Sequence, residues 1–292
     1  MILTMAQNSM QPELRNILKV CFNEKNEAID LLFKEKFNEN NTVVCIEDGK
    51  IVSAAYIFDN YIIYNKKKLP SCYLYAVATL PEYQGKGFMR KLLKYAEDIS
   101  KENGKFFSTL YPATSSLYDF YEKLGYKYFF KTSILEVDDY KLKNILDNSV
   151  DNKEKKTINF SYIFNLRENF YKQSGQVFWD ESTIRYACKA NNIYGGTTII
   201  SGRSYAICRR EKDSVIVVDS AILPEDAKSI IKSIKDKYNA KKYQFRLPVG
   251  MQLFGVSGKD IPFGMIKPLV NNSVCDKILK EIKNPYLGLV MD

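Results

Sequence analysis

Histidine is absent from this chain of 292 residues, and tryptophan occurs only once. Without an imidazole, the Ser/His/Asp and Cys/His nucleophile arrangements are excluded, as are the common metal sites that contain histidine. A general base must then be a carboxylate, a tyrosine, a lysine, a chain terminus or a water molecule. We therefore expect a site that holds no metal.

Paired cysteines and long apolar runs are also missing. No CxxC pair occurs, which favours buried, reduced cysteines in a cytoplasmic protein over a disulfide framework or a zinc site. No apolar run reaches about 18 residues, so we expect no membrane span, and the first residues do not resemble a signal peptide. The cysteines are Cys21, Cys45, Cys72, Cys188, Cys208 and Cys275.

The formal net charge is +9. A solvated basic surface explains this value by itself, and an anionic ligand such as a phosphate-rich cofactor is the sharper interpretation. No nucleic-acid-binding motif accompanies the charge, so we expect no nucleic-acid partner.

The first half of the chain shows helical spacing, then strand signals, then both again. Apolar residues at helical spacing predict helices at 12–22, 26–37, 88–102 and 115–125. Asp48-Gly49 suits the tight turn of a hairpin. The expected strands are 41–46, 51–58, 61–65, 72–80, 106–112 and 126–137, of which 72–80 is apolar on both sides and should be central.

The second half repeats this order in a weaker form. Residues 141–157 are polar and without a period, so we expect a linker there. Strands are then predicted at 197–202, 204–210, 215–223 and 241–248, with a helix at 224–238. Leu80-Pro81-Glu82 and Leu223-Pro224-Glu225 both lead from a strand into a helix, which indicates one supersecondary unit present twice. The second copy has no glycine loop.

The segment Gln84-Gly85-Lys86-Gly87-Phe88-Met89 joins a predicted strand to a predicted helix. A helix N-terminus presents unpaired N–H groups and a partial positive charge, and glycines let phosphate oxygens approach that backbone. A plain strand-to-helix turn is the alternative. The segment matches neither a P-loop nor a GxGxxG fingerprint.

In its context the segment resembles motif A of the GNAT superfamily of acyl-CoA N-acyltransferases, written [QR]xxGx[GA], with Gln84 and Gly87 matching and Met89 in place of Gly or Ala. Phe120-Tyr121 to Tyr126 resembles the second signature of the family, a Tyr four residues before a Gly. The tandem layout also resembles enhanced intracellular survival (Eis) acetyltransferases, although 292 residues leave no room for their third domain.

The resemblance implies an α/β (α+β) GNAT fold, a mixed, mostly antiparallel sheet flanked by helices. Residues 1–140 would form the acetyl-CoA-binding domain, 141–157 the linker, and 158–292 a degenerate GNAT-like domain without a cofactor site. The residues that the resemblance assigns to acetyl-CoA are Val77, Thr79, Gln84, Gly85, Lys86, Gly87, Met89 and Thr114.

Tyr121 is the catalytic residue that the resemblance implies, as the acid that protonates the departing thiolate of CoA. By itself it could equally be a packed tyrosine, since the chain has 21. Tyr73 stands where some members carry a glutamate base. Glu24, Glu27, a water relay and the terminal carboxylate of Asp292, which is used in Eis-like enzymes, remain open as substitutes.

The expected function is the transfer of acetyl from acetyl-CoA to a primary amine. A small-molecule amine is favoured over a protein lysine or N-terminus, because a second domain can close a cleft. Phe178-Trp179 and residues 249–258 could line this cleft, although core packing is the simpler role for Trp179. Residues 285–292 are predicted to form a closing strand. A silent acyl-CoA-binding module is the rival, and a homo-oligomer stays open.

Overall fold

The computed structural model describes residues 1–146 and 158–291, and its chain divides into two compact units. Unit 1 consists of Met1–Phe129 and Gly264–Ile282. Unit 2 consists of Phe130–Phe263 and the segment from Lys283 onward. The chain therefore leaves unit 1, builds most of unit 2, and then returns.

Unit 1 has one mixed sheet with the strand order β1-β2-β3-β4-β5-β16-β6. Along this order, within the described residues, the β4–β5 pair is parallel and the other pairs are antiparallel, which confirms the expected mixed, mostly antiparallel sheet. The elements of unit 1 are β1 (Ile2–Met5), η1 (Asn8–Met10), α1 (Gln11–Phe22), α2 (Asn26–Glu35), β2 (Thr42–Glu47), β3 (Lys50–Tyr64), β4 (Lys67–Thr79), η2 (Pro81–Tyr83), α3 (Phe88–Glu102), β5 (Phe107–Leu110), α4 (Ser115–Glu122), β6 (Lys127–Tyr128), β16 (Met265–Pro268) and α9 (Ser273–Glu281).

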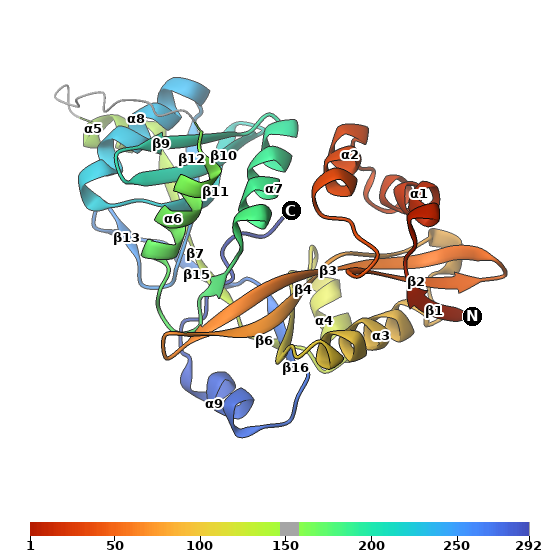
Figure 1. Cartoon of the computed structure of the whole chain (residues 1–292). Helices are drawn as coiled ribbons and strands as arrows, with labels where there is room; N and C mark the ends of the chain where they lie inside the picture. The colour runs from red at the N-terminus through yellow and green to blue at the C-terminus, as the bar shows by residue number, and fades with distance from the viewer. Residues whose placement is uncertain (147–157, 292) are drawn as a thin grey trace. The chain divides into compact units, whose positions relative to one another are not determined.

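Helices cover both faces of this sheet, with α1 and α2 on one face and α3 and α4 on the other (Figure 1). Asp48 and Gly49 both have positive φ angles, which is the turn geometry that suits a two-residue hairpin. The strands predicted at 51–58 and 61–65 form the single long strand β3. As expected, β4 is central, between β3 and β5.

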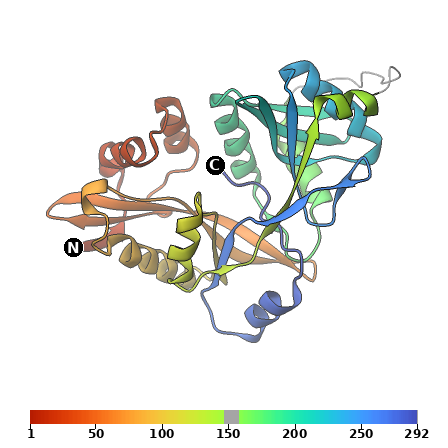
Figure 2. The same ribbon diagram turned by 180° about the vertical axis from the view of Figure 1, so that it is seen from behind.

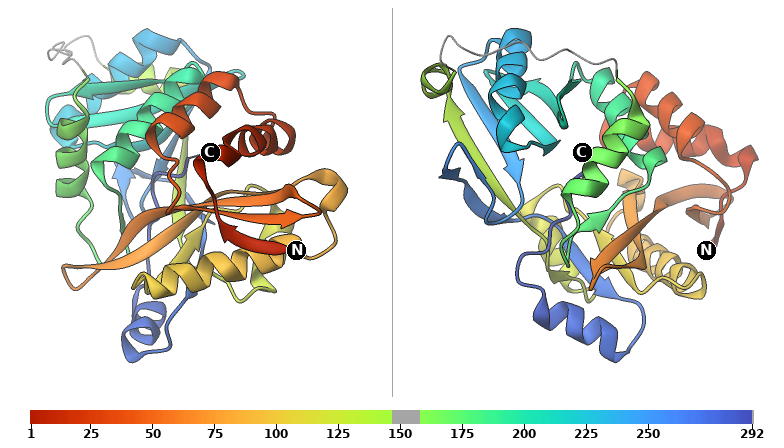
Figure 3. Two further views of the ribbon diagram at one scale, coloured as in Figure 1. Left: turned by 45° about the vertical axis from the view of Figure 1, so that its right-hand side comes forward. Right: turned by 60° about the vertical axis from the view of Figure 1, so that its left-hand side comes forward.

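Unit 2 has a sheet with the order β15-β7-β12-β11-β10-β9, in which only β11 and β12 are parallel. Figure 3 shows α8 on one side of this sheet and α6 with α7 on the other. Its elements are β7 (Lys131–Asp138), α5 (Asp139–Ile145), α6 (Phe160–Phe170), β8 (Val177–Phe178), α7 (Glu181–Ile193), β9 (Thr197–Ser201), β10 (Ser204–Glu211), β11 (Ser214–Ala221), η3 (Pro224–Asp226), α8 (Ala227–Tyr238), β12 (Lys242–Leu247), β13 (Gln252–Leu253), β14 (Val256–Ser257) and β15 (Lys259–Pro262).

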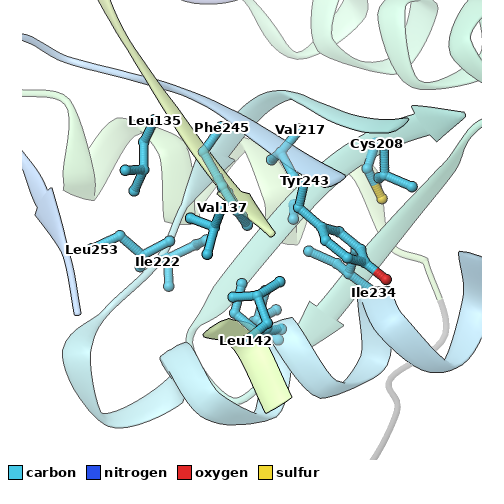
Figure 4. Close-up of a cluster of buried hydrophobic side chains, with 14 of the residues drawn as sticks. Leu135, Val137, Leu142, Cys208, Val217, Ile222, Ile234, Tyr243, Phe245 and Leu253 are labelled. Atoms are coloured by element: carbon cyan, nitrogen blue, oxygen red, sulfur yellow. The ribbon is translucent and has the colours of Figure 1, made fainter. Parts of the chain in front are cut away.

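The core of unit 2 lies between its sheet and the helices α5 and α8. Figure 4 shows Leu142 of α5 and Ile234 of α8 converging on strand residues such as Val137 and Phe245. The core therefore gathers apolar side chains from elements that are more than a hundred residues apart in the sequence.

The predicted repeat is present in both units. The order β4–η2–α3–β5 in unit 1 corresponds to β11–η3–α8–β12 in unit 2, and each helix connects two parallel strands. Both copies of Leu-Pro-Glu run into a short 3-10 helix that begins at the proline.

The division of the chain differs from the expected boundary at residue 140. The strand predicted at 126–137 is two strands, because β6 pairs with β16 in the first sheet and β7 pairs with β12 and β15 in the second. Residues 264–282 return to unit 1, shown in blue and ending in α9 in Figure 2. Local sequence cannot reveal which sheet a strand joins, because that depends on its distant partner.

Two further predictions concern the linker and the chain end. Residues 141–145 of the expected linker belong to α5, which begins at Asp139, and 147–157 lie outside the described residues. The expected closing strand at 285–292 is wrong, since the described part of it contains only an isolated bridge at Tyr286. The apolar residues of this segment are buried in unit 2 instead, so their burial, and not strand pairing, explains why the segment is apolar.

All six cysteines are free, and all except the half-buried Cys21 are buried, which confirms the expected burial for five of them. Among the helices that the structure describes, none is both long and apolar enough to cross a membrane.

Candidate functional site

Strand β4 carries a bulge near its C-terminal end. The pairing with β3 shifts between Ala54 and Tyr56, and Ala76 adopts a positive φ of 46° on the opposite strand. The parallel register with β5 ends at the Tyr73–Thr109 pair. Within the described ranges, the following residues of β4 therefore have no strand neighbour on that side. Such a divergence opens backbone groups to a ligand.

Val77 and Thr79, the two residues assigned to this strand, have different environments. Val77 is half-buried and packs against the core between β4 and α3. Thr79 is buried, with its hydroxyl 2.8 Å from Ser53 Oγ. The Thr79 carbonyl accepts from Gln84 Nε2 at 3.0 Å and from Cys21 Sγ at 3.5 Å. This carbonyl is thus already engaged inside the protein.

The glycine loop runs from η2 to the start of α3. Gly85 and Gly87 have φ angles of +75° and +81°, which disfavour any residue with a side chain, and no atom lies within 4 Å of where a Cβ would stand on either. Gln84 fixes the loop to β4 through its bond to Thr79. The loop is therefore a preformed, open stretch of backbone.

Positive charge surrounds this helix start. Gly87 occupies the N-cap position of α3 without a capping side chain, and the first turn has no acidic residue. The N–H groups of a first turn have no partner within their own helix. Lys86 is exposed, with Nζ 5.1 Å from the centre of the Tyr83 ring. Arg90, also exposed, adds a second cation that the motif did not single out, although its place in the first turn was a usable signal.

Tyr121 lies in the last turn of α4 with 6% of its surface exposed. The N–H of Tyr126 donates to the Tyr121 carbonyl at 3.1 Å, and that of Gly125 to the Glu122 carbonyl at 2.9 Å. With Gly125 at φ +89°, these bonds form a Schellman motif, which explains why the tyrosine precedes the glycine by four residues. The rings of Tyr121 and Tyr126 meet edge to face, 5.6 Å between centres.

The hydroxyl of Tyr121 has no hydrogen-bond partner among the residues that the structure describes. Burial raises the pKa of this phenol above its ordinary value, so the group holds its proton at neutral pH. A buried, protonated phenol with a free hydroxyl can act as a proton donor to a ligand.

Thr114 and Met89 stand at the edges of the site. Thr114 is the N-cap residue of α4, exposed, with Oγ1 3.0 Å from Ser116 Oγ. Met89 is half-buried and packs on the same core as Val77 and Tyr121. The structure therefore brings the strand, the helix start and the phenol to one core of unit 1.

The base candidates are unequal. Glu24 is half-buried between α1 and α2 and accepts from the Lys25 N–H at 3.2 Å, and burial raises its pKa. Glu27 is exposed in the first turn of α2. Tyr73 is buried in β4. Asp292 lies outside the described residues.

In unit 2 a buried carboxylate stands at the corresponding helix start, without a hydrogen bond to the first turn of that helix. Helix α8 follows η3 directly, and Asp226 is the N-cap residue. Asp226 Oδ2 accepts from the Arg203 N–H at 2.8 Å and from Ser204 Oγ at 2.9 Å. A Cβ atom on Gly202 would lie only 2.2 Å from Asp226 Oδ1, so the carboxylate occupies the space beside this glycine. The buried negative charge of Asp226 would repel a phosphate group.

Residues 4–129 match the model of the acetyltransferase (GNAT) domain. This region, which contains the bulged strand, the glycine loop and Tyr121, is therefore a GNAT acetyltransferase domain. No curated protein matched the sequence of the chain.

Solved structures share the fold of both units. Eis1 from Mycobacterium abscessus superimposes with a TM-score of 0.70 at 10% identity, covering 92% of this chain and 74% of that one. An N-acetyltransferase from Anabaena variabilis gives 0.72 at 17% identity, covering 92% and 73%. A putative acetyltransferase from Pyrococcus horikoshii gives 0.58 at 12% identity, covering 99% and 94%. At these identities the likeness concerns the fold alone.

Proposed function

We propose that this protein is an N-acetyltransferase that moves acetyl from acetyl-CoA to a primary amine, by direct attack within a ternary complex. The observation that supports it is the meeting of three features on one core of unit 1. These are the divergence of β4 from β5, the open glycine loop before α3, and the buried phenol of Tyr121.

The residues of the site fit acetyl-CoA, which supplies the activated acyl group when it is bound. The backbone N–H groups of residues 85–89 and the ammonium group of Lys86 would hold the pyrophosphate. The Val77 N–H would donate to the thioester carbonyl, and the Tyr121 hydroxyl would give its proton to the departing sulfur. Thr114 would contact the cofactor only weakly, since its hydroxyl already faces Ser116.

The acceptor is proposed to be a small amine, an inference from the presence of a second GNAT-like unit that carries no glycine loop. Its base would be Glu24, Glu27, a water molecule or the carboxylate of Asp292. Burial raises the pKa of Glu24, which makes this carboxylate a stronger base than an ordinary glutamate.

A silent acyl-CoA-binding module is the second candidate. The observation that favours it is Tyr73, a buried side chain without a carboxylate at the place on β4 where some family members hold a base. Both candidates require acetyl-CoA to bind in unit 1, and only the enzyme releases CoA.

The experiment that tests the proposal has two stages. Calorimetric titration with acetyl-CoA should give one site per chain, since the second helix start has no glycine loop and carries the buried carboxylate of Asp226. CoA release is then followed by mass spectrometry across polyamines, aminoglycosides, amino acids and lysine peptides, and turnover with small amines is expected. Binding without any turnover supports the silent module. An absence of binding contradicts both.

A further inference from the structure

A buried ion pair joins the late strand β16 to helix α3. Lys267 Nζ lies 2.6 Å from Glu97 Oε2, with side-chain exposures of 24% and 6% respectively. Glu97 is on the inward face of α3, where a carboxylate without a partner would be costly. Lys267 belongs to residues 264–282, which return to unit 1 after most of unit 2 has been built.

Tyr126 lies directly beside this pair. Its hydroxyl is 2.7 Å from Ser108 Oγ and also interacts with the Glu97 carboxylate. Lys267 Nζ stands 5.5 Å from the centre of its ring. A Cβ on Gly125 would be 3.5 Å from Lys267 Cε, an ordinary contact distance, so the stem of this lysine lies alongside the turn of the second signature.

Tyr126 in turn contacts Tyr121. Its N–H holds the Tyr121 carbonyl, and its ring meets the ring of Tyr121 edge to face. The hydroxyl of Tyr121 has no bond of its own to fix its direction within the described residues. Its direction therefore depends on the packing of its ring, to which Tyr126 contributes directly.

We propose that Lys267 is a positioning residue for Tyr121, acting through Glu97 and Tyr126. Loss of the ammonium group leaves the Glu97 carboxylate buried and unpaired. That carboxylate then recruits water or moves, and Tyr126 loses one of the contacts that hold its ring. A displacement of Tyr121 by a fraction of an ångström lowers turnover, because proton transfer depends on close alignment. The inference rests on the proposed function, in which Tyr121 is the acid.

The test is a double-mutant cycle with Lys267→Met and Tyr121→Phe. In the wild-type background we expect Lys267→Met to lower kcat about fivefold or more, with the KM for acetyl-CoA unchanged. In the Tyr121→Phe background the same change should have less than about a twofold effect, because the group that Lys267 positions is already gone. Equal losses in both backgrounds would overturn the proposal.

Two variants keep the test independent of stability. Lys267→Arg preserves the charge and should restore most of kcat, as a purely electrostatic support requires. Lys105→Met is the matched control, because Lys105 is also a mostly buried lysine of unit 1, bonded to Asp59 at 2.6 Å, and is outside the network. Should Lys267→Met not fold, Tyr126→Phe replaces it in the cycle, since it removes the hydroxyl contacts and keeps the ring.

A crystal structure of the Lys267→Met protein gives a readout without turnover. The proposal expects the Tyr121 ring to be displaced relative to the wild-type crystal structure, and an unmoved ring contradicts it. A displaced ring with full activity in the Tyr121→Phe variant would instead uphold the positioning role while removing Tyr121 from the proposed chemistry. A failure of the positioning role of Lys267 can thus be distinguished from a failure of the proposed role of Tyr121.

Discussion

Tyr121 and Gly125 show how one residue pair can combine fold and chemistry. The glycine closes α4 with a Schellman motif, and the same turn fixes the backbone of Tyr121 beside Tyr126. The family spacing of these two residues is therefore a helix-capping rule as well as a signature. The function proposed for Tyr121 depends on its hydroxyl alone. It can therefore be tested without disturbing the packing of the ring.

We predict that Tyr121→Phe lowers kcat by tenfold or more, equivalent to about 1.4 kcal/mol, while acetyl-CoA affinity is nearly unchanged. The ring and its contacts remain, and only the proton donor is lost. Turnover and calorimetric titration of the same preparation measure the two quantities. Unchanged turnover would remove Tyr121 from the mechanism.

A second residue-scale prediction concerns the buried ion pair of unit 2. Arg167 Nε is 3.3 Å from Asp219 Oδ2, and the two side chains are 4% and 0% exposed. Because Arg167→Met leaves a buried charge, it should reduce the free energy of unfolding by about 3–5 kcal/mol. Removing both charges, with Arg167→Met and Asp219→Leu together, should cost less.

Urea unfolding measures this through the fluorescence of Trp179, the only tryptophan, which is 1% exposed in unit 2 and donates Nε1–H to the Leu287 carbonyl at 3.1 Å. This burial confirms core packing for Trp179. Arg203→Met is the control, because the Arg203–Glu225 pair is exposed and screened by solvent, so its loss should change the free energy of unfolding little. A similar loss for both arginines would argue against the buried-charge account.

At the scale of elements, the strand–helix–strand unit that occurs in both halves of the chain has two different helix starts. In unit 1 four residues, two of them glycine, separate η2 from α3, and the N–H groups remain open. In unit 2 the helix begins at once, after the buried Asp226, whose carboxylate bonds to Arg203 and Ser204. The same order of elements thus has an open glycine loop in one copy and a buried carboxylate in the other.

We predict that Gly87→Ala weakens acetyl-CoA binding about tenfold, because a side chain at positive φ costs about 1 kcal/mol and the loop relaxes away from its open form. The matched control is Gly104→Ala at the far end of α3, where φ is +74° and space is equally open. Both variants should lose similar stability, measured by thermal unfolding. Equal loss of affinity in both would contradict a specific role for the loop.

At the scale of the whole molecule, each unit is made from two separate stretches of chain. Strand β16 lies between β5 and β6, so the sheet of unit 1 is incomplete without residues 264–282. The segment 1–140 is therefore not an independent domain, because two of its strands pair with a strand that lies outside it.

We predict that a chain ending at residue 140 fails to fold, because β5 and β6 lose the strand that joins them. Residues 1–129 linked by a short flexible loop to 264–282 should fold, since the Phe129 N–H lies 3.3 Å from the Gly264 carbonyl and the ends are adjacent. Circular dichroism and thermal unfolding of both chains test this. A folded 1–140 chain would show that β16 is dispensable.

Buried tyrosines predict how stability depends on pH. Burial raises the pKa of Tyr121, Tyr126 and Tyr205 in the folded protein above that of an unfolded chain. The unfolded state therefore releases these protons first, so the free energy of unfolding should be flat near neutral pH and fall above about pH 10. Exposed tyrosines such as Tyr140 can ionise without unfolding, so only the last part of the tyrosinate absorbance should rise together with unfolding. Ionisation of every tyrosine in a still folded protein would contradict the burial of these phenols.

The helices α1 to α4 and α8, the Asp48-Gly49 hairpin, the central strand and the glycine loop could be read from the sequence, whereas α6, α7 and α9 were not predicted. Each is encoded by neighbouring residues: apolar spacing, a turn pair, or glycines before a helix. Tyr121 was found through a spacing that the Schellman motif explains. These signals are local, so the sequence carries them without reference to the rest of the chain.

The bulge at Ala76, the pairing of β6 with β16, and the contact of Lys267 with Glu97 were decided only by the tertiary structure. Lys267 is 170 residues from Glu97, and nothing near either residue records the other. The sequence by itself determined that the chain has a GNAT-type strand, loop and helix. The tertiary structure decided which distant segments complete them, because strand partners and buried charges are chosen by packing rather than by local preference.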